Sequence, residues 1–276
     1  MANDTETIKI LFFGDLVGRP GRVAVRDYIE NLRQENNLPD FIIANVENAS
    51  HGFGLTEKNY NDMLEYGVNC MTSGNHIWDK KDIFNYIEQA ENLVRPFNYP
   101  KGAKGVGSSI FDCNGAKIAV INALGQVFMN IVDSPWQAVV DEIKRLKEIT
   151  PIVIVDFHAE ATAEKICFAK YVSELGVSAF FGTHTHVQTA DERIMSNMAY
   201  ITDAGMCGSD EGVIGMDYNT SLTRFVSGLP ERYDVASGGS TVTNVVEVEI
   251  ETSTGNAIAI KRIFCINNEV VEEKGT

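Results

Sequence analysis

Apolar runs alternate with amphipathic segments along the first two thirds of the chain. Five of these runs have the length and composition of buried strands: residues 8–14, 41–46, 68–72, 152–157 and 177–181. After the first run, apolar residues recur at the spacing of one helix face, at positions 25, 28, 29 and 32. Later gaps between the runs show the same kind of pattern. A strand followed by a helix, repeated along the chain, predicts parallel βαβ units.

Capping residues indicate where the predicted helices begin and end. Pro20 suits a first helical residue, because its fixed φ angle and missing N–H are tolerated there. Thr56 is predicted as an N-cap, and Gly67 as the residue that ends the same helix. Ser134, in a capping-box pattern, and Thr162 are predicted as the caps of two later helices.

Two turn sequences predict β-hairpins in addition to the parallel units. Asn114-Gly115 lies between two strand-like runs, and this pair favours a tight hairpin turn. The tail, 241–266, has the pattern of two antiparallel strands joined by a turn at 253–256. Parallel units with added hairpins indicate an α/β fold in which helices cover two mixed sheets. Neither repeats nor a linker interrupt the pattern, so we predict one domain over residues 1–276.

The chain carries 38 acidic and 23 basic residues, for a formal net charge of −15. Such a surface repels polyanions and argues against extended nucleic-acid binding, although bound cations can still hold a small anion locally. The polar segment Met1–Thr7 does not resemble a secretory signal, and no apolar stretch is long enough to span a bilayer. We therefore expect a cytoplasmic protein without a membrane partner. Five scattered cysteines argue against a disulfide framework or a thiolate zinc site.

Polar side chains follow five successive predicted strands, and four of the five histidines are among them. They are Asp15, then Glu47 and Asn48, Asn75 and His76, His158, and finally His184 and His186. Because ligands of open α/β sheets bind at the carboxyl ends of the strands, we expect these residues to share one site. Oxygen donors mixed with imidazoles suit manganese, iron or zinc better than magnesium or calcium. Seven candidate ligands exceed a single tetrahedral zinc and fit two metal ions that share a carboxylate.

Each of these residues alone has a purely structural explanation. Asp15 would cap the helix that follows it, and a dinucleotide-binding loop is disfavoured because the G-x-G-x-x-G spacing is absent. Asn75 and His76 tolerate the backbone angles of a turn, and His158 would fit a core position with its ring bonded to a carbonyl. The joint placement at five strand ends is what favours a metal site. The remaining histidine, His51, is predicted to be a solvated loop residue, and a position facing the site from a flexible loop stays open.

The order of these residues resembles the calcineurin-like metallophosphoesterases, and more closely the YmdB-like phosphodiesterase branch of that superfamily. The shared motifs are Gly14-Asp15, Asn45-x-Glu47-Asn48, Gly74-Asn75-His76, His158 and Gly182-x-His184-x-His186. Stretches at 54–58, 74–81, 92–96, 156–162, 184–191 and 215–217 also resemble that branch. The wider superfamily usually has an Asp-x-His motif where this chain has Asp15-Leu16-Val17. Asn48 is the expected replacement for the missing histidine ligand.

The resemblance implies a four-layer α-β-β-α sandwich with mixed sheets and a dinuclear site that holds iron or manganese. The first metal would bind Asp15, Glu47, Asn48 and His186, and the second Glu47, Asn75, His158 and His184, with Glu47 bridging. The resemblance also implies hydrolysis of cyclic nucleotides, with 2′,3′-cyclic nucleotides as the first expectation. A metal-bound hydroxide would attack the phosphorus, and His76 would act as the general acid that protonates the leaving alkoxide.

Arg19 and Arg95 adjoin predicted site loops, and we predict that one of them contacts the substrate phosphate, since arginine binds phosphate in a bidentate manner. A surface or helix-capping role is the alternative for each. Two other functions stay open: a phosphomonoesterase or nuclease with the same metal site, and a regulatory metal-binding protein with vestigial activity. The intact His76 argues against the regulatory protein. The predicted partner is a small phosphodiester, and a homo-oligomer stays open.

Overall fold

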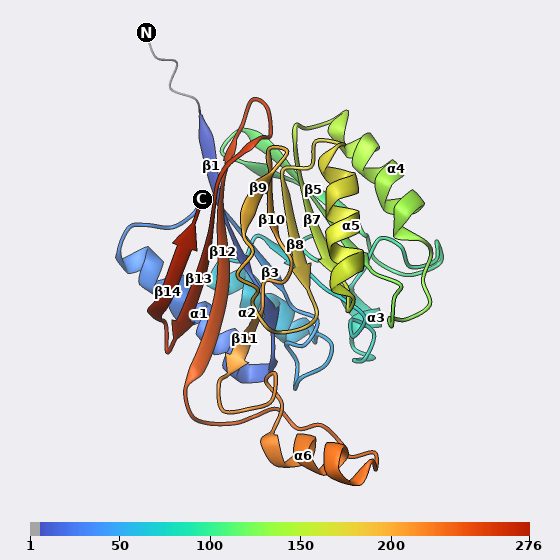
Figure 1. Cartoon of the computed structure of the whole chain (residues 1–276), viewed down its shortest axis with the longest axis vertical. Helices are drawn as coiled ribbons and strands as arrows, with labels where there is room; N and C mark the ends of the chain where they lie inside the picture. The colour runs from blue at the N-terminus through green and yellow to red at the C-terminus, as the bar shows by residue number, and fades with distance from the viewer. Residues whose placement is uncertain (1–5) are drawn as a thin grey trace.

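The computed structural model describes residues 6–276, and it consists of two β-sheets packed face to face with helices on both outer sides (Figure 1). Residues 1–5 lie outside the described residues, and they make up most of the segment Met1–Thr7 in which the sequence predicts no secretory signal. Among residues 6–276, no helix combines the length and the apolar character that a membrane span requires.

The first sheet joins three parallel strands from the start of the chain to three antiparallel strands from its end. Its order is β14 (Glu269–Gly275), β13 (Ala257–Ile266), β12 (Thr241–Glu251), β1 (Thr7–Phe13), β3 (Phe41–Asn45) and β4 (Cys70–Thr72). The short strands β2 (Asp15–Leu16) and β11 (Met206–Ser209) pair at the end of β12. The predicted tail hairpin is confirmed as β12 and β13, whereas the sequence did not predict β14.

The second sheet has a parallel centre and antiparallel edges. Its order is β5 (Ser108–Cys113), β6 (Ala116–Leu124), β7 (Ile152–His158), β8 (Ala179–Thr183), β10 (Met198–Ile201) and β9 (Arg193–Met195). Asn114 and Gly115 join β5 to β6 with φ angles of 51° and 90°. Two successive positive φ angles are typical of the tight hairpin turn that the sequence predicted.

Three helices cover the first sheet, two cover the second, and one projects away from both (Figure 1). The first group is α1 (Gly18–Gln34), α2 (Glu57–Tyr66) and α3 (Ile83–Tyr86), and the second is α4 (Pro135–Lys147) and α5 (Thr162–Ser173). Alternation along β1 explains the layers, because Ile10 and Phe12 point to the second sheet while Leu11 and Phe13 point to the helices. The ring of Phe12 stacks on that of Phe181 from β8, at 4.3 Å between centroids. The four-layer α-β-β-α prediction is confirmed.

The caps of α2 are confirmed, because Thr56 accepts a hydrogen bond from the Asn59 N–H and Gly67 ends the helix at φ 107°. In contrast, the capping box predicted at Ser134 is wrong. Ser134 occupies the N-cap position, but only its main-chain carbonyl takes part, accepting from the N–H groups of the first turn.

Two other helix starts also differ from the prediction. Thr162 is the first residue of α5 and not its cap, since the carbonyl of Ala161 already accepts from the Lys165 N–H at 3.1 Å. Helix α1 begins at Gly18, two residues before Pro20. The φ angle of 59° at Gly18 lets the chain turn directly from β2 into the helix.

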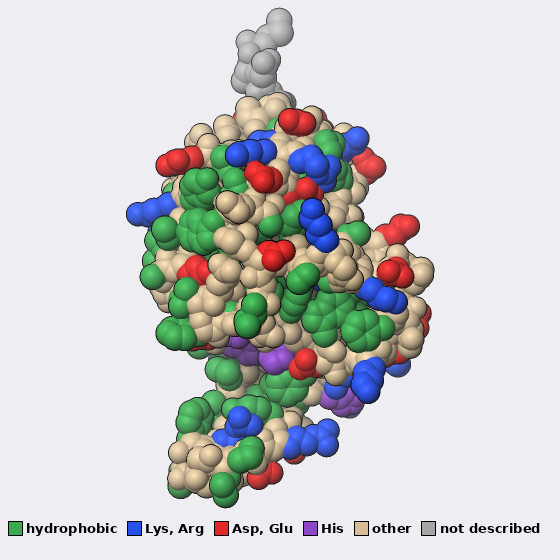
Figure 2. All heavy atoms as spheres, turned by 90° about the vertical axis from the view of Figure 1, so that its right-hand side faces the viewer, with side chains coloured by type: hydrophobic (Ala, Val, Ile, Leu, Met, Phe, Trp, Pro, Cys, Tyr) green, Lys and Arg blue, Asp and Glu red, His purple; other side chains and the backbone are tan. Residues whose placement is uncertain are grey.

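Residues 210–240, between β11 and β12, form an arm that projects from the sandwich and carries α6 (Tyr218–Ser227) (Figure 1). In Figure 2 the histidines lie in the hollow between the sandwich and this arm. The sequence analysis did not predict the helix of this arm, in which only Ser221 is buried. Its helix leaves Phe225 and Val226 largely exposed, instead of burying a regular apolar stripe.

Candidate active site

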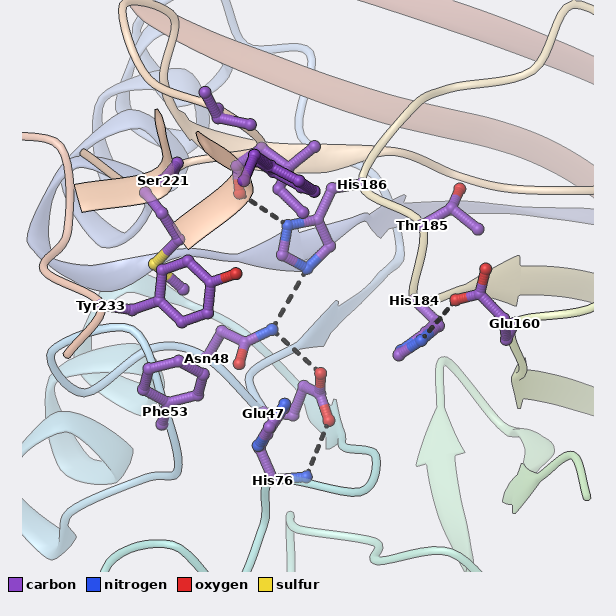
Figure 3. Close-up of a pocket in the computed structure, with 14 residues that line it drawn as sticks. Glu47, Asn48, Phe53, His76, Glu160, His184, Thr185, His186, Ser221 and Tyr233 are labelled. Atoms are coloured by element: carbon purple, nitrogen blue, oxygen red, sulfur yellow. Dashed lines mark hydrogen bonds and ion pairs between the residues drawn. The ribbon is translucent and has the colours of Figure 1, made fainter. Parts of the chain in front are cut away.

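The polar residues that follow the parallel strands meet at one edge of the sandwich. Strands β1, β3 and β4 of the first sheet and β7 and β8 of the second sheet all run towards this edge. The structure thereby brings together all seven predicted ligands: Asp15, Glu47, Asn48, Asn75, His158, His184 and His186. Figure 3 shows the part of this group that lines a pocket.

One half of the group surrounds Nε2 of His158, which is fully buried. This atom lies 3.2 Å from Oε1 of Glu47, 3.1 Å from Oδ1 of Asn75 and 3.0 Å from Nδ1 of His184. One ring nitrogen cannot make good hydrogen bonds to three acceptors at once. Four converging donor atoms of this kind are the arrangement that a cation requires, so these residues fit a metal ion.

In each of the two rings the outer nitrogen has an acceptor for its proton, so the inward nitrogen is the one that can give its lone pair to a cation. Thr183 donates its hydroxyl to Asp156 at 2.7 Å and therefore accepts from Nδ1 of His158 at 2.9 Å. Likewise, Nε2 of His184 lies 3.0 Å from the carboxylate of Glu160. Each partner holds the proton on the outer nitrogen and directs the inner lone pair into the site, as the second shell of a metal centre does.

The other half of the group contains Asp15, Asn48 and His186. His186 donates Nδ1–H to the carbonyl of Ile214 at 2.9 Å, which leaves Nε2 as an acceptor. The amide nitrogen of Asn48 lies between this Nε2, at 3.2 Å, and Oε1 of Glu47, at 2.9 Å. Oδ1 of Asp15 and Oδ1 of Asn48 are buried without a hydrogen-bond partner. Buried oxygens of this kind require compensation, and a cation would supply it.

Glu47 belongs to both halves. Ligand atoms of Glu47, His158 and His184 lie within 4.8 Å of one another, and so do those of Asp15, Glu47 and His186. Burial acts to lower the pKa of His158, but the charge and hydrogen bond of Glu47, together with the charges of Asp15 and Asp156, outweigh it and raise this pKa to about 9. Burial acts to raise the pKa of Glu47, but His158 leaves it well below its ordinary value. The buried carboxylates thus favour positive charge at this position.

Backbone geometry holds the histidine loop in place. His184 and His186 have φ angles of 102° and 66°, which side chains other than glycine rarely adopt. Between them, the N–H and hydroxyl of Thr185 both donate to Asp203, at 3.1 and 2.8 Å. Asp203 in turn is paired with Lys165 at 2.6 Å, and both side chains are 1% exposed. The sequence did not predict this ion pair, because neither residue carries a local signal.

A glycine allows the two halves of the group to approach each other. A Cβ atom on Gly74 would collide with Oε2 of Glu47 and with Nε2 of His158. The motif residue before Asn75 therefore has to be glycine if the carboxylate and the imidazole are to converge.

His76 lies next to the ligand group but is not enclosed by it. Its main-chain N–H donates to Oε2 of Glu47 at 3.0 Å, and its side chain is 31% exposed. Nδ1 of His76 lies 2.9 Å from the carboxylate of Asp79. A carboxylate that accepts from Nδ1 leaves Nε2 of the same ring available to a substrate. Asp79 is a site residue that the sequence analysis missed, although its spacing of three residues from His76 is a usable signal.

The ligand group forms the floor of a pocket of ≈ 370 Å³. Glu47, Asn48, His76, His184 and His186 face this space together with Glu160, which the sequence analysis also missed. The rest of the wall comes from Phe53 and from the arm. The volume suits a small ligand.

The structure does not bring Arg19 or Arg95 into this pocket. The guanidinium of Arg95 is buried and donates to five main-chain carbonyls, those of Pro96, Phe97, Ala103, Lys104 and Gly105. With its donors used in this way, Arg95 holds a loop and has none left for a phosphate. Arg19 is exposed on the first turn of α1. His51 lies in an exposed loop, as expected.

A family model described as YmdB-like protein matches residues 11–263. The chain belongs to the YmdB-like family. The chain is 45% identical over 263 residues to the 2′,3′-cyclic-nucleotide 2′-phosphodiesterase of Bacillus subtilis strain 168, covering 95% of this chain and 98% of that protein. The resemblance seen in the motifs is therefore confirmed for nearly the whole chain.

Two solved structures place this YmdB-like chain among known folds. A crystal structure described as a novel phosphatase from Mycoplasma pneumoniae superposes with a TM-score of 0.87 at 36% identity, covering 95% of this chain and 94% of that one. A putative 5′-nucleotidase from Staphylococcus aureus superposes with a TM-score of 0.57 at 12% identity, covering 97% of this chain and 54% of that one. The second likeness concerns the fold alone.

Proposed function

We propose that this protein is a metal-dependent phosphodiesterase that hydrolyses cyclic nucleotides, with 2′,3′-cyclic nucleotides as its first substrate class. The observation that carries the proposal is a carboxylate, Glu47, shared by two groups of converging ligand atoms directly beside the His76–Asp79 pair. Two relatives of this chain are named as a phosphodiesterase and as a putative phosphatase/phosphodiesterase, and these names support the assignment as a phosphoric ester hydrolase.

Two divalent ions are the proposed cofactors. Asp15, Glu47, Asn48 and His186 would hold one ion, and Glu47, Asn75, His158 and His184 the other. Mixed oxygen and imidazole donors favour iron or manganese. When bound, such ions polarise the phosphoryl oxygens and lower the pKa of a water to the point where it can attack phosphorus.

His76 is the proposed general acid. Attack by water, which releases one of its protons to solvent, forms a P–O bond as the bond to the 2′ oxygen breaks, and the departing oxygen requires a proton. Nε2 of His76 supplies this proton, while Asp79 accepts from Nδ1 and orients the ring. The reaction leaves a 3′-nucleotide in which the 2′ hydroxyl carries the donated proton.

The charge of the pocket favours a diester over a monoester. Its described lining contains Glu47 and Glu160 but neither lysine nor arginine. The charge of two divalent ions, minus the charges of the Asp15 and Glu47 carboxylates, is about +2, and the carboxylate of Glu160 reduces it further. A phosphodiester carries one negative charge, whereas a phosphomonoester dianion would be compensated less well.

Metal analysis followed by a substrate screen tests the proposal. The protein is loaded with Mn²⁺ or Fe²⁺ and assayed on 2′,3′-cyclic, 3′,5′-cyclic and linear phosphodiesters and on nucleoside monophosphates. We expect two ions per chain and fastest turnover of the 2′,3′-cyclic substrates. An Asp15→Asn variant, purified in parallel, controls for contaminating enzymes. A fully loaded protein that turns over no diester would contradict the proposal and favour a regulatory role.

A further inference from the structure

One wall of the active-site pocket is apolar and comes largely from the arm, residues 210–240. It is formed by Phe53, Val213, Ile214, Met216, Phe225 and Tyr233. The ligand group occupies the floor beside this wall (Figure 3). A phosphodiester held at the floor would therefore place one of its two ester groups against apolar side chains.

Two aromatic rings lie at the boundary between this wall and the catalytic residues. The centroid of Phe53 is 4.9 Å from that of His76 and 6.4 Å from that of Tyr233, with planes tilted by 63° and 44°. In Figure 3 the rings of Phe53 and Tyr233 lie next to each other beside Asn48. The rings are thus one side chain away from the proposed proton donor.

Arg224 holds the ring of Tyr233 from outside the pocket. Its guanidinium carbon lies 4.1 Å from the centroid of this ring, and its Nη1 donates to the carbonyl of Glu231 at 2.6 Å. Arg224 does not itself line the pocket. The cation–π contact restrains the orientation of the ring and leaves its pocket side available.

The wall offers almost no group that could recognise the edge of a base. Ser221 faces the same space, but its hydroxyl donates to the carbonyl of Asp217 at 2.8 Å. Apart from the Tyr233 hydroxyl, the other wall side chains, all within the described part of the chain, carry no strong hydrogen-bonding group, since the thioether of Met216 is only a weak acceptor. Every nucleobase has a π-face, so an aromatic surface without edge contacts binds bases with little discrimination.

We propose that Phe53 and Tyr233 form a stacking platform for the nucleobase, so that the enzyme accepts 2′,3′-cyclic phosphates of all four bases. This inference rests on the proposed function and adds the part of the substrate that the arm contacts. The phosphate lies at the ligand group, the ribose next to His76, and the base on the two rings. Phe53 and Tyr233 are specificity-determining residues that favour nucleotides over phosphodiesters without a base.

Steady-state kinetics with and without the base test this platform. The Mn²⁺-loaded protein is assayed on the 2′,3′-cyclic phosphates of adenosine, guanosine, cytidine and uridine, and on the corresponding 1-O-methyl ribose 2′,3′-cyclic phosphate. We expect kcat/KM to be about tenfold higher for the nucleotides than for the abasic compound, the size of one stacking contact. The four bases should differ from one another by less than this factor.

Single-residue variants test whether Phe53 and Tyr233 form the platform. Tyr233→Leu and Phe53→Leu should each lower the ratio of kcat/KM for the nucleotides to that for the abasic substrate, by up to about tenfold, and in Tyr233→Leu the change should lie in KM for the nucleotides. Tyr233→Phe should restore the wild-type values, because stacking does not require the hydroxyl. Tyr171→Leu removes an exposed aromatic ring on α5, outside the pocket, and should change the kinetics on neither substrate.

The outcomes separate this inference from the proposed function. Equal kcat/KM for nucleotides and the abasic compound would overturn the platform and leave the phosphodiesterase standing. The same loss on both substrates in Tyr233→Leu would make the residue structural and would also overturn it. A preference for one base larger than the preference over the abasic compound would indicate recognition of the base edge instead. Turnover of no cyclic phosphate at all would remove both proposals.

Discussion

At the scale of single residues, the site depends on one carboxylate that two sets of ligands share. Oε1 of Glu47 lies within reach of His158 and of Asn48, while Oε2 accepts from the main chain of His76. A substitution of Glu47 would therefore disturb its contacts to His158, Asn48 and His76 at the same time. The residue is also fully enclosed, so a substituted side chain has no room to turn away.

The first prediction follows from this sharing. Glu47→Gln, which keeps the shape but removes the charge, should lower the content of both ions, because a neutral amide cannot compensate two cations. His186→Ala should remove mainly one ion, since its ring belongs to one half only. Metal content per chain, measured by mass spectrometry on both purified variants, checks this. Two retained ions in Glu47→Gln would contradict the shared role.

The second prediction separates proton donation from binding at His76. His76→Ala should keep its metal content and lower kcat by about 10²- to 10⁴-fold on a cyclic nucleotide. The loss should be much smaller on an aryl phosphodiester, because p-nitrophenolate leaves without a proton. Asp79→Asn should give a weaker form of the same pattern, since it only orients the ring. Equal losses on both substrates would instead assign His76 to stabilising the phosphoryl charge.

At the scale of elements, the loop after β8 is held in a strained conformation by a buried ion pair. The positive φ angles of His184 and His186 cost free energy that the bonds from Thr185 to Asp203 offset. Lys165, from α5, fixes Asp203 in turn. A helix on the outer face of the second sheet therefore positions ligands at the edge of that sheet.

The third prediction tests this positioning. Asp203→Asn leaves the buried Lys165 without its counter-charge, which should destabilise the protein by about 3–5 kcal/mol. It should also weaken metal binding, because the loop between the two histidines loses its anchor. Asp62→Asn, which breaks the exposed pair of Asp62 with Lys58 on α2, is the matched control and should cost about 0–1 kcal/mol. Chemical denaturation and metal titration of both variants measure these effects, and unchanged metal affinity in Asp203→Asn would refute the positioning role.

At the scale of the whole molecule, the two sheets meet at the ligand group. Asp15, Glu47 and Asn75 follow strands of the first sheet, while His158 and His184 belong to the second. Away from this edge, the centre of the interface between the sheets is apolar, as in the stack of Phe12 on Phe181, with polar links such as Arg262 to Glu192 at its margin. Bound ions would therefore link the two layers of the sandwich directly.

The fourth prediction concerns thermal stability. Saturating Mn²⁺ should raise the melting temperature of the chelator-treated protein by several degrees, since a ligand at 100 times its Kd stabilises by about 2.7 kcal/mol. The Glu47→Gln variant should show a much smaller rise. Thermal unfolding with and without Mn²⁺ measures both, and an equal rise in the variant would show that the ion acts elsewhere.

Much of the fold follows from local patterns. Strands buried on both faces appear as continuous apolar runs, and the turn at Asn114-Gly115 has few other conformations open to it. The sequence failed where several conformations have similar free energy, as at the starts of α1 and α5. It also failed for α6, whose apolar residues Leu222, Phe225 and Val226 recur at helical spacing but stay exposed instead of packing on the core.

By itself, the sequence determined the kinds of ligand and their places at the ends of strands. Parallel strands of one sheet end at the same edge, so Glu47 and Asn75 had to lie close together within the first sheet, and His158 and His184 within the second. That these two sets face each other was decided by the packing of the two sheets. Only the tertiary structure decided which side chains orient them, as Glu160, Asp79 and Asp203 do, because such contacts join segments without a shared local pattern. The tertiary structure also removes Arg95 as a phosphate contact, because its guanidinium donates to main-chain carbonyls that no sequence pattern indicates.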